Sequence, residues 1–288
     1  MNLNYELTEP LVIISYDDAP LTDYTIAFPL HVQFGIPAEI NVISDYIGVS
    51  GYLTKEQILN IYGAGWNIVA HSKGHKLLID SFINTTVNIG DKKIYISEPD
   101  FFKHCPCKIY EGNKSEEIIT GSSGKDSIGT FVQLETGIKG YYSANARIGL
   151  TDESIKEQII SCKNFFLKIG ISVDHFTYPW NAYDARSQQI VAEHYISARA
   201  GSTTAINERG SINRHCLNSV DFIDLIMEGK LEKVLNETVR KRALCILFAH
   251  TWDPRFTANK LLTLFNELQK RGIRIGTRND AMVFFEKS

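Results

Sequence analysis

The chain alternates between short, almost wholly apolar runs and longer stretches with helical spacing of apolar residues. Its first three apolar runs are Leu11–Ile14, Ala38–Ile43 and Asn67–Ala70, each preceding or following an amphipathic stretch. Four more strand-like runs come later in the chain: Val173–Tyr178, Ile196–Arg199, Ala243–Ala249 and Ile273–Gly276. Strands without polar alternation are buried on both faces, which is typical of parallel sheets covered by helices. The pattern therefore predicts an α/β fold with a parallel sheet or barrel.

One segment, from about Ile83 to Ile148, departs from this alternation. It is rich in Gly, Ser, Thr and Tyr, and its short β-type runs are separated by turn signals such as Ser123-Gly124-Lys125. A span of roughly 65 residues is too long for an ordinary loop. We therefore predict three parts: residues 1–82 begin the α/β domain, 83–149 form a small inserted β domain, and 150–288 complete the α/β domain.

Composition and charge limit the classes of partner. The chain carries 30 Lys and Arg against 33 Asp and Glu, a net charge of −3, so we expect no nucleic-acid partner. Five cysteines, two of them in apolar runs, do not suggest a disulfide framework. The sequence shows no signal-peptide pattern and no apolar window long enough for a membrane span. The cytoplasm, or a virion or surface reached by another route, would fit; the oligomeric state is open.

Reactive side chains follow four of the predicted strands. They are Ser15-Tyr16-Asp17-Asp18, His71-Ser72-Lys73-Gly74-His75, Tyr178-Pro179-Trp180-Asn181 and His250-Thr251-Trp252-Asp253. Each cluster alone has an ordinary explanation: adjacent acids cap turns, a pair of histidines four apart arises by chance, and a histidine or aromatic after a strand packs in the core. Because the carboxyl ends of parallel strands form one face, however, we expect all four clusters to converge.

The residue types suggest metal-assisted hydrolysis. A carboxylate and two imidazoles make a three-ligand site with open positions, and Asp18, His71 and His75 would be its ligands. Neighbouring residues of an extended chain face opposite ways, so Asp17 would be free to act as a general base. His250, from a distant strand, would be a separate acid. The same ligand set also suits an Fe(II) oxygenase, but that reading gives Asp17 and His250 no role.

At these clusters the sequence resembles the polysaccharide deacetylase family, the NodB-homology carbohydrate esterases. SYDDAP resembles the first motif of the family with its paired aspartates, and HSKGH resembles the H-S/T-x-x-H motif. FTYPWNAYD resembles the third motif and ILFAHT the last. The resemblance covers Leu11–Asp80 and Thr151–Phe285, everything except the insertion. It implies a distorted (β/α) barrel of about seven parallel strands.

The resemblance also implies roles for individual residues. Asp17 corresponds to the catalytic base, Asp18, His71 and His75 to the metal ligands, and His250 to the catalytic acid. The cofactor would be a divalent metal, most often zinc and sometimes cobalt or another ion. The implied reaction is hydrolysis of an acetyl group from an N-acetylated or O-acetylated sugar. The implied partner is an acetylated polysaccharide or oligosaccharide.

Three departures from the family pattern concern the substrate more than the metal. Thr177 stands where many members carry an arginine that braces the base, and Arg214 is a candidate replacement. Phe248 stands where a leucine usually lines the acetyl pocket, and it would narrow that pocket. The fourth motif has no clean counterpart, because Asp221 and Asp224 lack the accompanying Trp and open what reads as a single helix over Val220–Arg240. The other candidates for substrate contact are Tyr178, Pro179 and Trp180.

Two further functions stay open at this point. The missing Arg and Trp and the β insertion suit a non-catalytic glycan-binding protein of a virion or surface assembly. Phe248 and Trp180 would also suit a hydrolase of a small non-sugar amide that uses the same site. Aromatic residues of the insertion would present a sugar-stacking face or form the core of a small domain; they are Tyr95, Phe101, Phe102, Tyr141 and Tyr142.

Overall fold

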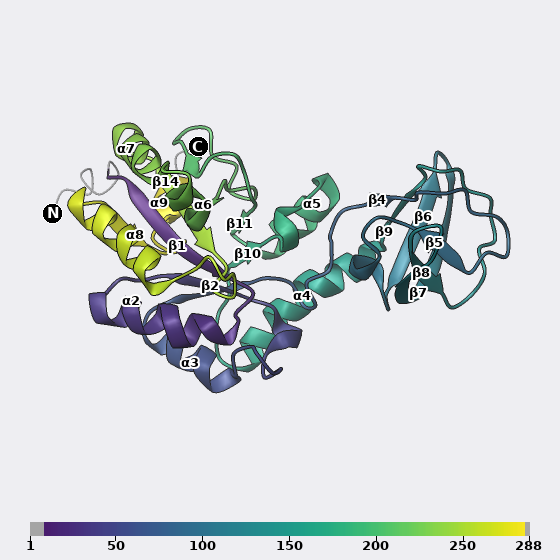
Figure 1. The fold of residues 1–288 in the computed structure, drawn as a ribbon, viewed down its shortest axis with the longest axis horizontal. Helices are drawn as coiled ribbons and strands as arrows, with labels where there is room; N and C mark the ends of the chain where they lie inside the picture. Colours follow the sequence, from purple (N-terminus) through teal and green to yellow (C-terminus); the bar gives the residue numbers. More distant parts are fainter. Residues whose placement is uncertain (1–8, 286–288) are drawn as a thin grey trace.

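Two sheets lie at opposite ends of the long axis of the molecule (Figure 1). The computed structural model describes residues 9–285. Helices surround the larger sheet, whereas the smaller sheet projects away from it and has no helix packed along its length in this view (Figure 1). None of the helices between residues 9 and 285 is long and apolar enough to cross a bilayer.

The larger sheet is built from mostly parallel strands in the order β11-β10-β3-β2-β1-β14-β12, with β13 paired to β14 and β15 to β1. Its strands are β1 (Leu11–Asp17), β2 (Glu39–Val42), β3 (Asn67–Ala70), β10 (His175–Thr177), β11 (Ser197–Arg199), β12 (Ile206–Asn207), β13 (Val220–Asp221), β14 (Leu244–Ala249) and β15 (Arg274–Gly276). Only β12 runs antiparallel to its neighbour. The predicted parallel α/β sheet is confirmed.

The sheet curls into a distorted barrel. Residues 214–221, a turn followed by an extended stretch from Leu217, connect its two edges. On one side Ala198 N–H donates to the Arg214 carbonyl and Leu217 N–H donates to the Ala198 carbonyl, so the segment pairs with β11. On the other side β13 pairs in parallel with β14. The segment therefore stands in the place of a seventh parallel strand, as the resemblance implied.

The interior of the barrel changes from apolar to polar along the strands. Leu11 and Ile13 of β1 pack with Leu244 and Ile246 of β14, and Phe284 covers them at the amino-terminal end. Side chains two apart in a strand share a face, so Ser15 and Asp17 continue the same interior row. Polar groups therefore collect inside the barrel at the carboxyl ends of the strands.

Helices cover the outside of the barrel. The π-helix η1 (Asp23–Ala27) runs into the α-helix α2 (Phe28–Phe34). The other α-helices are α3 (Lys55–Gly63), α4 (Asp152–Lys168), α5 (Ala185–His194), α6 (Phe222–Met227), α7 (Leu231–Lys241), α8 (Ala258–Lys270) and α9 (Met282–Phe285). Short 3-10 turns are η2 (Ser44–Tyr46), η3 (Pro99–Phe102) and η4 (Pro179–Asn181).

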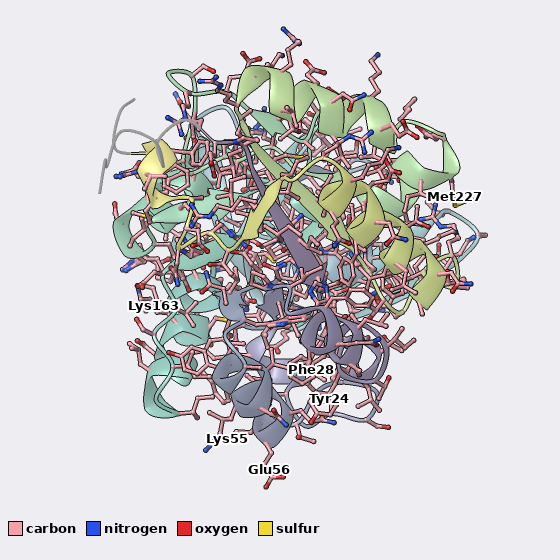
Figure 2. The ribbon with its side chains drawn as sticks, turned by 90° about the vertical axis from the view of Figure 1, so that its left-hand side faces the viewer. Tyr24, Phe28, Lys55, Glu56, Lys163 and Met227 are labelled. Carbon is pink, nitrogen blue, oxygen red and sulfur yellow. The ribbon has the colours of Figure 1, made fainter. Side chains whose placement is uncertain are left out.

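Local sequence explains how α3 begins. The Thr54 side chain accepts a hydrogen bond from Gln57 N–H, and Gln57 Oε1 accepts one from Thr54 N–H. This reciprocal capping box satisfies two amide groups that the first helical turn leaves free. Figure 2 shows Lys55 and Glu56 pointing outward from this turn, while Tyr24 and Phe28 stack on each other at the η1–α2 junction. The polar start and apolar inner face together fix α3 against the sheet.

The smaller sheet is antiparallel throughout, in the order β4-β9-β6-β7-β8-β5. Its strands are β4 (Ser81–Phe82), β5 (Lys93–Tyr95), β6 (Pro106–Glu111), β7 (Lys114–Lys125), β8 (Thr130–Leu134) and β9 (Arg147–Leu150). We propose that this sheet is the inserted domain expected over residues 83–149.

Two local predictions are wrong. Ser123-Gly124-Lys125 is not a turn but lies inside β7, where the Phe131 ring of β8 packs against Gly124 and would collide with any Cβ there. Val220–Arg240 is not one helix. It begins as β13 and then forms α6 and α7, which are separated at Gly229, a residue with φ of +66°. Glycine adopts this conformation without a Cβ penalty, so it ends the first helix.

Candidate active site

The predicted clusters that follow β1, β3, β10 and β14 meet at one end of the barrel. Asp18 lies beside His71 and His75, with one possible ligand atom from each within 4.8 Å of the others. The Trp180 ring centroid is 4.7 Å from that of His75. His250 Nε2 is 3.9 Å from Asp17 Oδ2. The predicted convergence of all four strand ends is therefore present.

Asp18, His71 and His75 form a nearly regular triangle of ligand atoms. The two Nε2 atoms are 3.2 Å apart, and each lies 3.5 Å from Asp18 Oδ1. Ligands about 2.0–2.2 Å from a tetrahedral ion would be separated by about 3.3–3.6 Å. The residues present therefore fit a divalent metal without rearrangement.

Hydrogen bonding around the triangle leaves the metal-facing atoms available. His71 Nδ1–H donates to the Thr177 carbonyl over 2.8 Å, which leaves its Nε2 lone pair facing the triangle. Asp18 Oδ1 is buried and has no hydrogen-bond partner among residues 9–285. Burial and the neighbouring His71 lower the pKa of His75 to about 4, so its imidazole is neutral at pH 7. A buried carboxylate oxygen without a donor is costly unless a cation binds it.

Backbone strain is concentrated at this end of the barrel. Asp18, Ser72, His75 and Trp180 all have positive φ, at 77°, 65°, 55° and 59°. Side chains other than glycine adopt this region rarely and at a cost of order 1–3 kcal/mol each. The strand alternation alone was expected to separate Asp17 from Asp18. Instead, Asp18 turns out of β1 through its positive φ and so reaches the histidines.

Asp17 is held by a buried arginine from another strand. Arg199 Nη2 lies 2.6 Å from both carboxylate oxygens, and Asn41 Nδ2 donates to Oδ1 over 2.7 Å. Burial alone would raise the pKa of Asp17, but Arg199, followed by His250 and His71, lowers it below its usual value. Asp17 is therefore an ionised carboxylate at neutral pH and is not one of the three ligand residues.

A second buried arginine, Arg278, holds Asn41, which contacts Asp17. Arg278 donates to Glu39 Oε2, to the Phe176 carbonyl, to Asn41 Oδ1 and to Thr177 Oγ1. Asn41 thus accepts from Arg278 through its oxygen while its nitrogen donates to Asp17. This chain of bonds fixes the amide of Asn41 in one orientation and, through it, the position of Asp17.

His250 lies close to both carboxylates. Its Nε2 is 3.9 Å from Asp17 Oδ2 and 4.0 Å from Asp18 Oδ2, and its side chain is partly exposed. Phe248 packs edge-on against His250 and also covers the Arg199 guanidinium at 4.6 Å. The position of Phe248 therefore shields the Arg199–Asp17 ion pair from water as well as placing its ring beside His250.

Trp252 anchors the remaining oxygen of Asp18. Its Nε1–H donates to Asp18 Oδ2 over 2.9 Å, which leaves Oδ1 to face the histidines. Trp252 also lines a cavity of about 420 Å³ beside the triangle; the other lining residues are Asp18, Pro20, Ile43, Tyr46, Gly51, Tyr52, His75 and Trp180. The cavity places an aromatic wall next to the candidate ligands.

Replacing Trp252 with phenylalanine tests this contact. We expect the affinity for zinc to fall about 10- to 100-fold, the usual effect of removing a hydrogen bond that orients a ligand. A competition titration against a zinc-binding dye measures it. Trp180→Phe is the matched control, because the Trp180 Nε1–H donates to the His75 carbonyl and not to a ligand atom. Equal zinc affinities for Trp252→Phe and the wild type would show that Asp18 does not need this bond.

Two of the residues predicted to meet the substrate lie elsewhere. Tyr178 is fully buried and donates its hydroxyl to the His215 carbonyl, so it belongs to the core. Arg214 is exposed, and the brace expected of it is supplied by Arg199. Pro179 is buried and begins η4, which presents Trp180. Of this set, Trp180 lines the cavity and Phe248 lies beside His250.

The sequence prediction gave no role to Arg199, Asn41 or Trp252, although Trp252 stands in one of the four predicted clusters. Arg199 is the last residue of a strand that was correctly predicted, so the rule that identified the other four strand ends applies to it as well. Asp221, which was assigned no role, is half-buried at the start of α6, and desolvation raises its pKa to about 6. The nearby His250 opposes this effect of burial on the pKa of Asp221.

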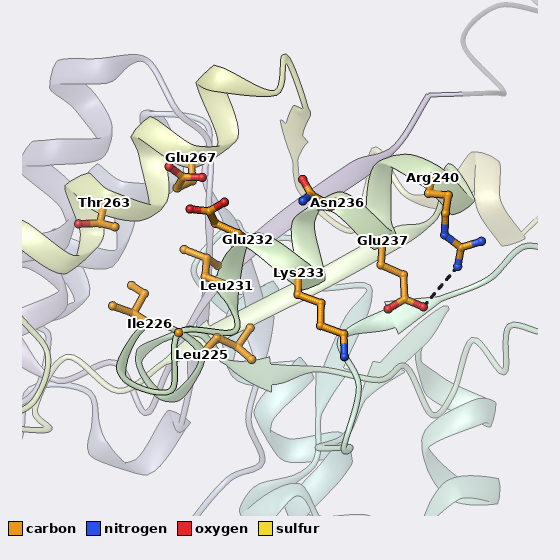
Figure 3. Close-up of a pocket in the computed structure, with 11 residues that line it drawn as sticks. Leu225, Ile226, Leu231, Glu232, Lys233, Asn236, Glu237, Arg240, Thr263 and Glu267 are labelled. Atoms are coloured by element: carbon orange, nitrogen blue, oxygen red, sulfur yellow. Dashed lines mark ion pairs between the residues drawn. The ribbon is translucent and has the colours of Figure 1, made fainter.

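A larger cavity, of about 840 Å³, lies on the outer surface between α6, α7 and α8 (Figure 3). Several of its charged residues pair with neighbouring side chains, as Arg240 does with Glu237 and Glu267 does with Arg271. None of the candidate metal ligands lines it. This outer cavity is therefore separate from the candidate metal site at the barrel end.

Comparison with solved structures finds the same fold in carbohydrate-active proteins. A T48 deacetylase with substrate aligns with a TM-score of 0.55 at 12% identity, over 98% of this chain and 94% of that one. The chitin deacetylase of the fungus Colletotrichum lindemuthianum aligns with a TM-score of 0.55 at 13% identity, over 95% and 88%. The Xyl-CE4 domain of a xylanase from the hindgut metagenome of Trinervitermes trinervoides gives 0.52 at 12%, over 97% and 91%. The chain has the fold of these polysaccharide deacetylases and carbohydrate esterases.

Comparisons of sequence alone find no relative of this chain. No protein-family model matches the chain, and no curated protein matches it.

Proposed function

We propose that this chain, which has the fold of carbohydrate deacetylases and esterases, is a metal-dependent hydrolase that removes acetyl groups from N-acetylated or O-acetylated sugars of a polysaccharide. One observation carries the proposal. An Asp-His-His triangle spaced for a divalent ion lies beside an ionised carboxylate, Asp17, that is held by Arg199 and is not a ligand. A binding protein has no need of that second carboxylate.

Asp18, His71 and His75 would hold the ion, which we propose to be zinc. When bound, it would act as a Lewis acid on the acetyl group and on water. Asp17 would accept a proton from the water that attacks the acetyl carbon. His250 would donate a proton to the departing sugar nitrogen or oxygen as its bond to the acetyl carbon breaks. The products are acetate and the free amine or hydroxyl of the sugar, and the two proton transfers balance.

The surrounding residues would prepare these groups before substrate arrives. Arg199 and Asn41 keep the carboxylate of Asp17 in one place, and Phe248 excludes water from that ion pair. Trp180 and Trp252 would form the walls that receive the sugar. A site in which the groups are already oriented spends little free energy on reorganisation during the reaction.

The non-catalytic alternative loses much of its support. It rested partly on the missing arginine brace, and Arg199 fills that role from β11. The Trp that the fourth motif would place beside Asp221 is not replaced in the same way. The Asp221 side chain instead caps α6 by accepting a hydrogen bond from Ile223 N–H.

Acetate release tests the proposal directly. Zinc-loaded protein is incubated with N-acetylglucosamine oligomers and with acetylated xylan, and acetate is measured enzymatically. We expect release from at least one of them, abolished by a chelator and restored by zinc. Release that survives complete removal of the metal would contradict the proposed mechanism, and no release from any acetylated glycan would contradict the proposed substrate.

A further inference from the structure

The smaller sheet reaches the candidate active site through one aromatic residue. Phe101 in η3 contacts Trp180, with ring centroids 4.7 Å apart, and Trp180 contacts His75 over the same distance. A row of three rings therefore leads from a candidate metal ligand to the inserted sheet. The neighbouring Phe102 is fully buried, so it anchors η3 while Phe101 faces Trp180.

We propose that Phe101 and Trp180 bind a sugar residue next to the one that loses its acetyl group, so that the inserted sheet selects a polymer over a single sugar. This inference rests on the proposed deacetylase function and adds a specificity-determining residue, Phe101, from outside the barrel. The first supporting point is the exposure of Trp180. It is 53% exposed, although a large aromatic residue is normally buried when it serves only packing.

The conformation of Trp180 is the second point. It has a φ of +59°, which a bulky residue adopts only when its surroundings impose it. Its Nε1–H donates to the His75 carbonyl over 3.2 Å, and a Cβ at Gly201 would lie 2.8 Å from the Cβ of the adjacent Asn181. The turn is thus held tightly while the indole stays open to solvent. Strain of this kind accompanies binding sites more than core packing.

The third point is that η3 is tied to the barrel beside the site. Lys76, next to the candidate ligand His75, donates its Nζ to the Lys103 carbonyl over 2.8 Å, one residue after η3 ends. Phe101 is therefore fixed relative to the site from both the sheet and the barrel. A rigid aromatic surface loses little conformational entropy when it binds a ligand.

The surface has the chemistry of a sugar site. The C–H faces of a pyranose ring are apolar and pack on aromatic rings, while its hydroxyl groups remain in water. Tyr46, Tyr52, Trp180 and Trp252 surround the cavity next to the triangle, and Phe101 extends that aromatic surface toward the sheet. One sugar would occupy the cavity, and the next one along the chain would lie against Phe101 and Trp180.

Binding measured in an inactive background tests this inference. In zinc-loaded Asp17→Asn protein, calorimetry compares a pentamer of N-acetylglucosamine and an acetylated xylopentaose with the corresponding single sugars. We expect at least one pentamer to bind more tightly than its single sugar. We expect Phe101→Ala to weaken that pentamer about tenfold, as the loss of one aromatic contact implies, and to affect the single sugar much less.

Two further variants make the result specific. Phe101→Tyr keeps the ring and is expected to restore the affinity for the pentamer. Tyr141→Ala removes another exposed aromatic of the same region, 51% exposed and in contact with Lys114, and is expected to leave binding unchanged. Thermal unfolding checks that all variants are folded.

Each outcome decides one claim. An equal loss for pentamer and single sugar, no loss in Phe101→Ala, or no preference for either pentamer would overturn the role of Phe101. The proposed function is judged separately, from acetate release by the wild type. If pentamer binding depends on Phe101 but the wild type releases no acetate, the proposed sugar contact of Phe101 is supported and the proposed hydrolase function is contradicted.

Discussion

Replacing Asp17 with asparagine is expected to lower kcat for acetate release by about 10²–10⁴-fold while zinc remains bound. Asparagine has nearly the same shape and retains an oxygen that accepts from Arg199, but it cannot take a proton from water. Asp17 contributes no atom to the Asp18–His71–His75 triangle, so the metal content of the variant is expected to equal that of the wild type. Acetate release and elemental mass spectrometry on the same samples measure both quantities.

The matched control is the neighbouring carboxylate. Asp18→Asn is expected to lose zinc affinity and activity together, because Asp18 Oδ1 faces the two histidines. Separate effects at adjacent positions distinguish a base from a ligand. Full activity in Asp17→Asn, or loss of zinc in that variant, would show that the two roles are assigned wrongly.

Replacing Arg199 with methionine is expected to have the largest effect on stability. Arg199 and Asp17 are both buried, and methionine leaves the Asp17 carboxylate without its cation. Removing one partner of a buried ion pair lowers the free energy of unfolding by about 3–5 kcal/mol. Urea unfolding of the zinc-loaded protein at pH 7 measures this. The double variant Arg199→Met/Asp17→Asn is expected to recover part of the loss, since it removes the unpaired charge.

The same variant is expected to change the pH dependence of activity. In the wild type the pKa of Asp17 lies below its usual value, mainly because Arg199 opposes the effect of burial. The stability from this pair is therefore present above the unfolded pKa of about 3.9 and is lost as the pH falls through the lower folded pKa. Without Arg199 the pKa of Asp17 rises, so the acid limb of kcat/KM moves to higher pH. An unchanged acid limb would mean that Arg199 does not tune this carboxylate.

Much of the barrel could be predicted from apolar runs alone. A strand buried on both faces leaves a continuous run such as Leu11–Ile14, and the expected strand Asn67–Ala70 matches β3 at both ends. Residues at the carboxyl ends of such strands share one face in any parallel barrel, which is why Asp18, His71 and His75 were expected together. That argument depends on topology and not on any particular side chain.

The groups that were missed depend on contacts that no local pattern encodes. Arg199 is 182 residues from Asp17, and Trp252 is 234 residues from Asp18. A single arginine at a strand end or tryptophan in a loop looks the same whether it binds a carboxylate or faces solvent. The helix predicted over Val220–Arg240 failed for a related reason: pairing of β13 with β14 determined its first residues, overriding their helical spacing.

Phe101 shows the same difficulty within the insertion. It was one of five aromatic residues for which the sequence favours the core of a small domain over a sugar-stacking face. The structure separates them: Phe102 and Tyr142 are buried in the core, whereas Phe101 contacts Trp180. Only the position of the sheet relative to the barrel makes that distinction.

The most direct measurement is the zinc content of the purified protein and of a His75→Ala variant, both loaded with zinc, desalted and analysed by elemental mass spectrometry. The proposed site predicts about one zinc per chain in the wild type and a large loss in the variant, because His75 would supply one of the three candidate ligand atoms. No retained zinc in the wild type, or equal zinc in both proteins, would contradict the metal site on which the proposed hydrolase depends.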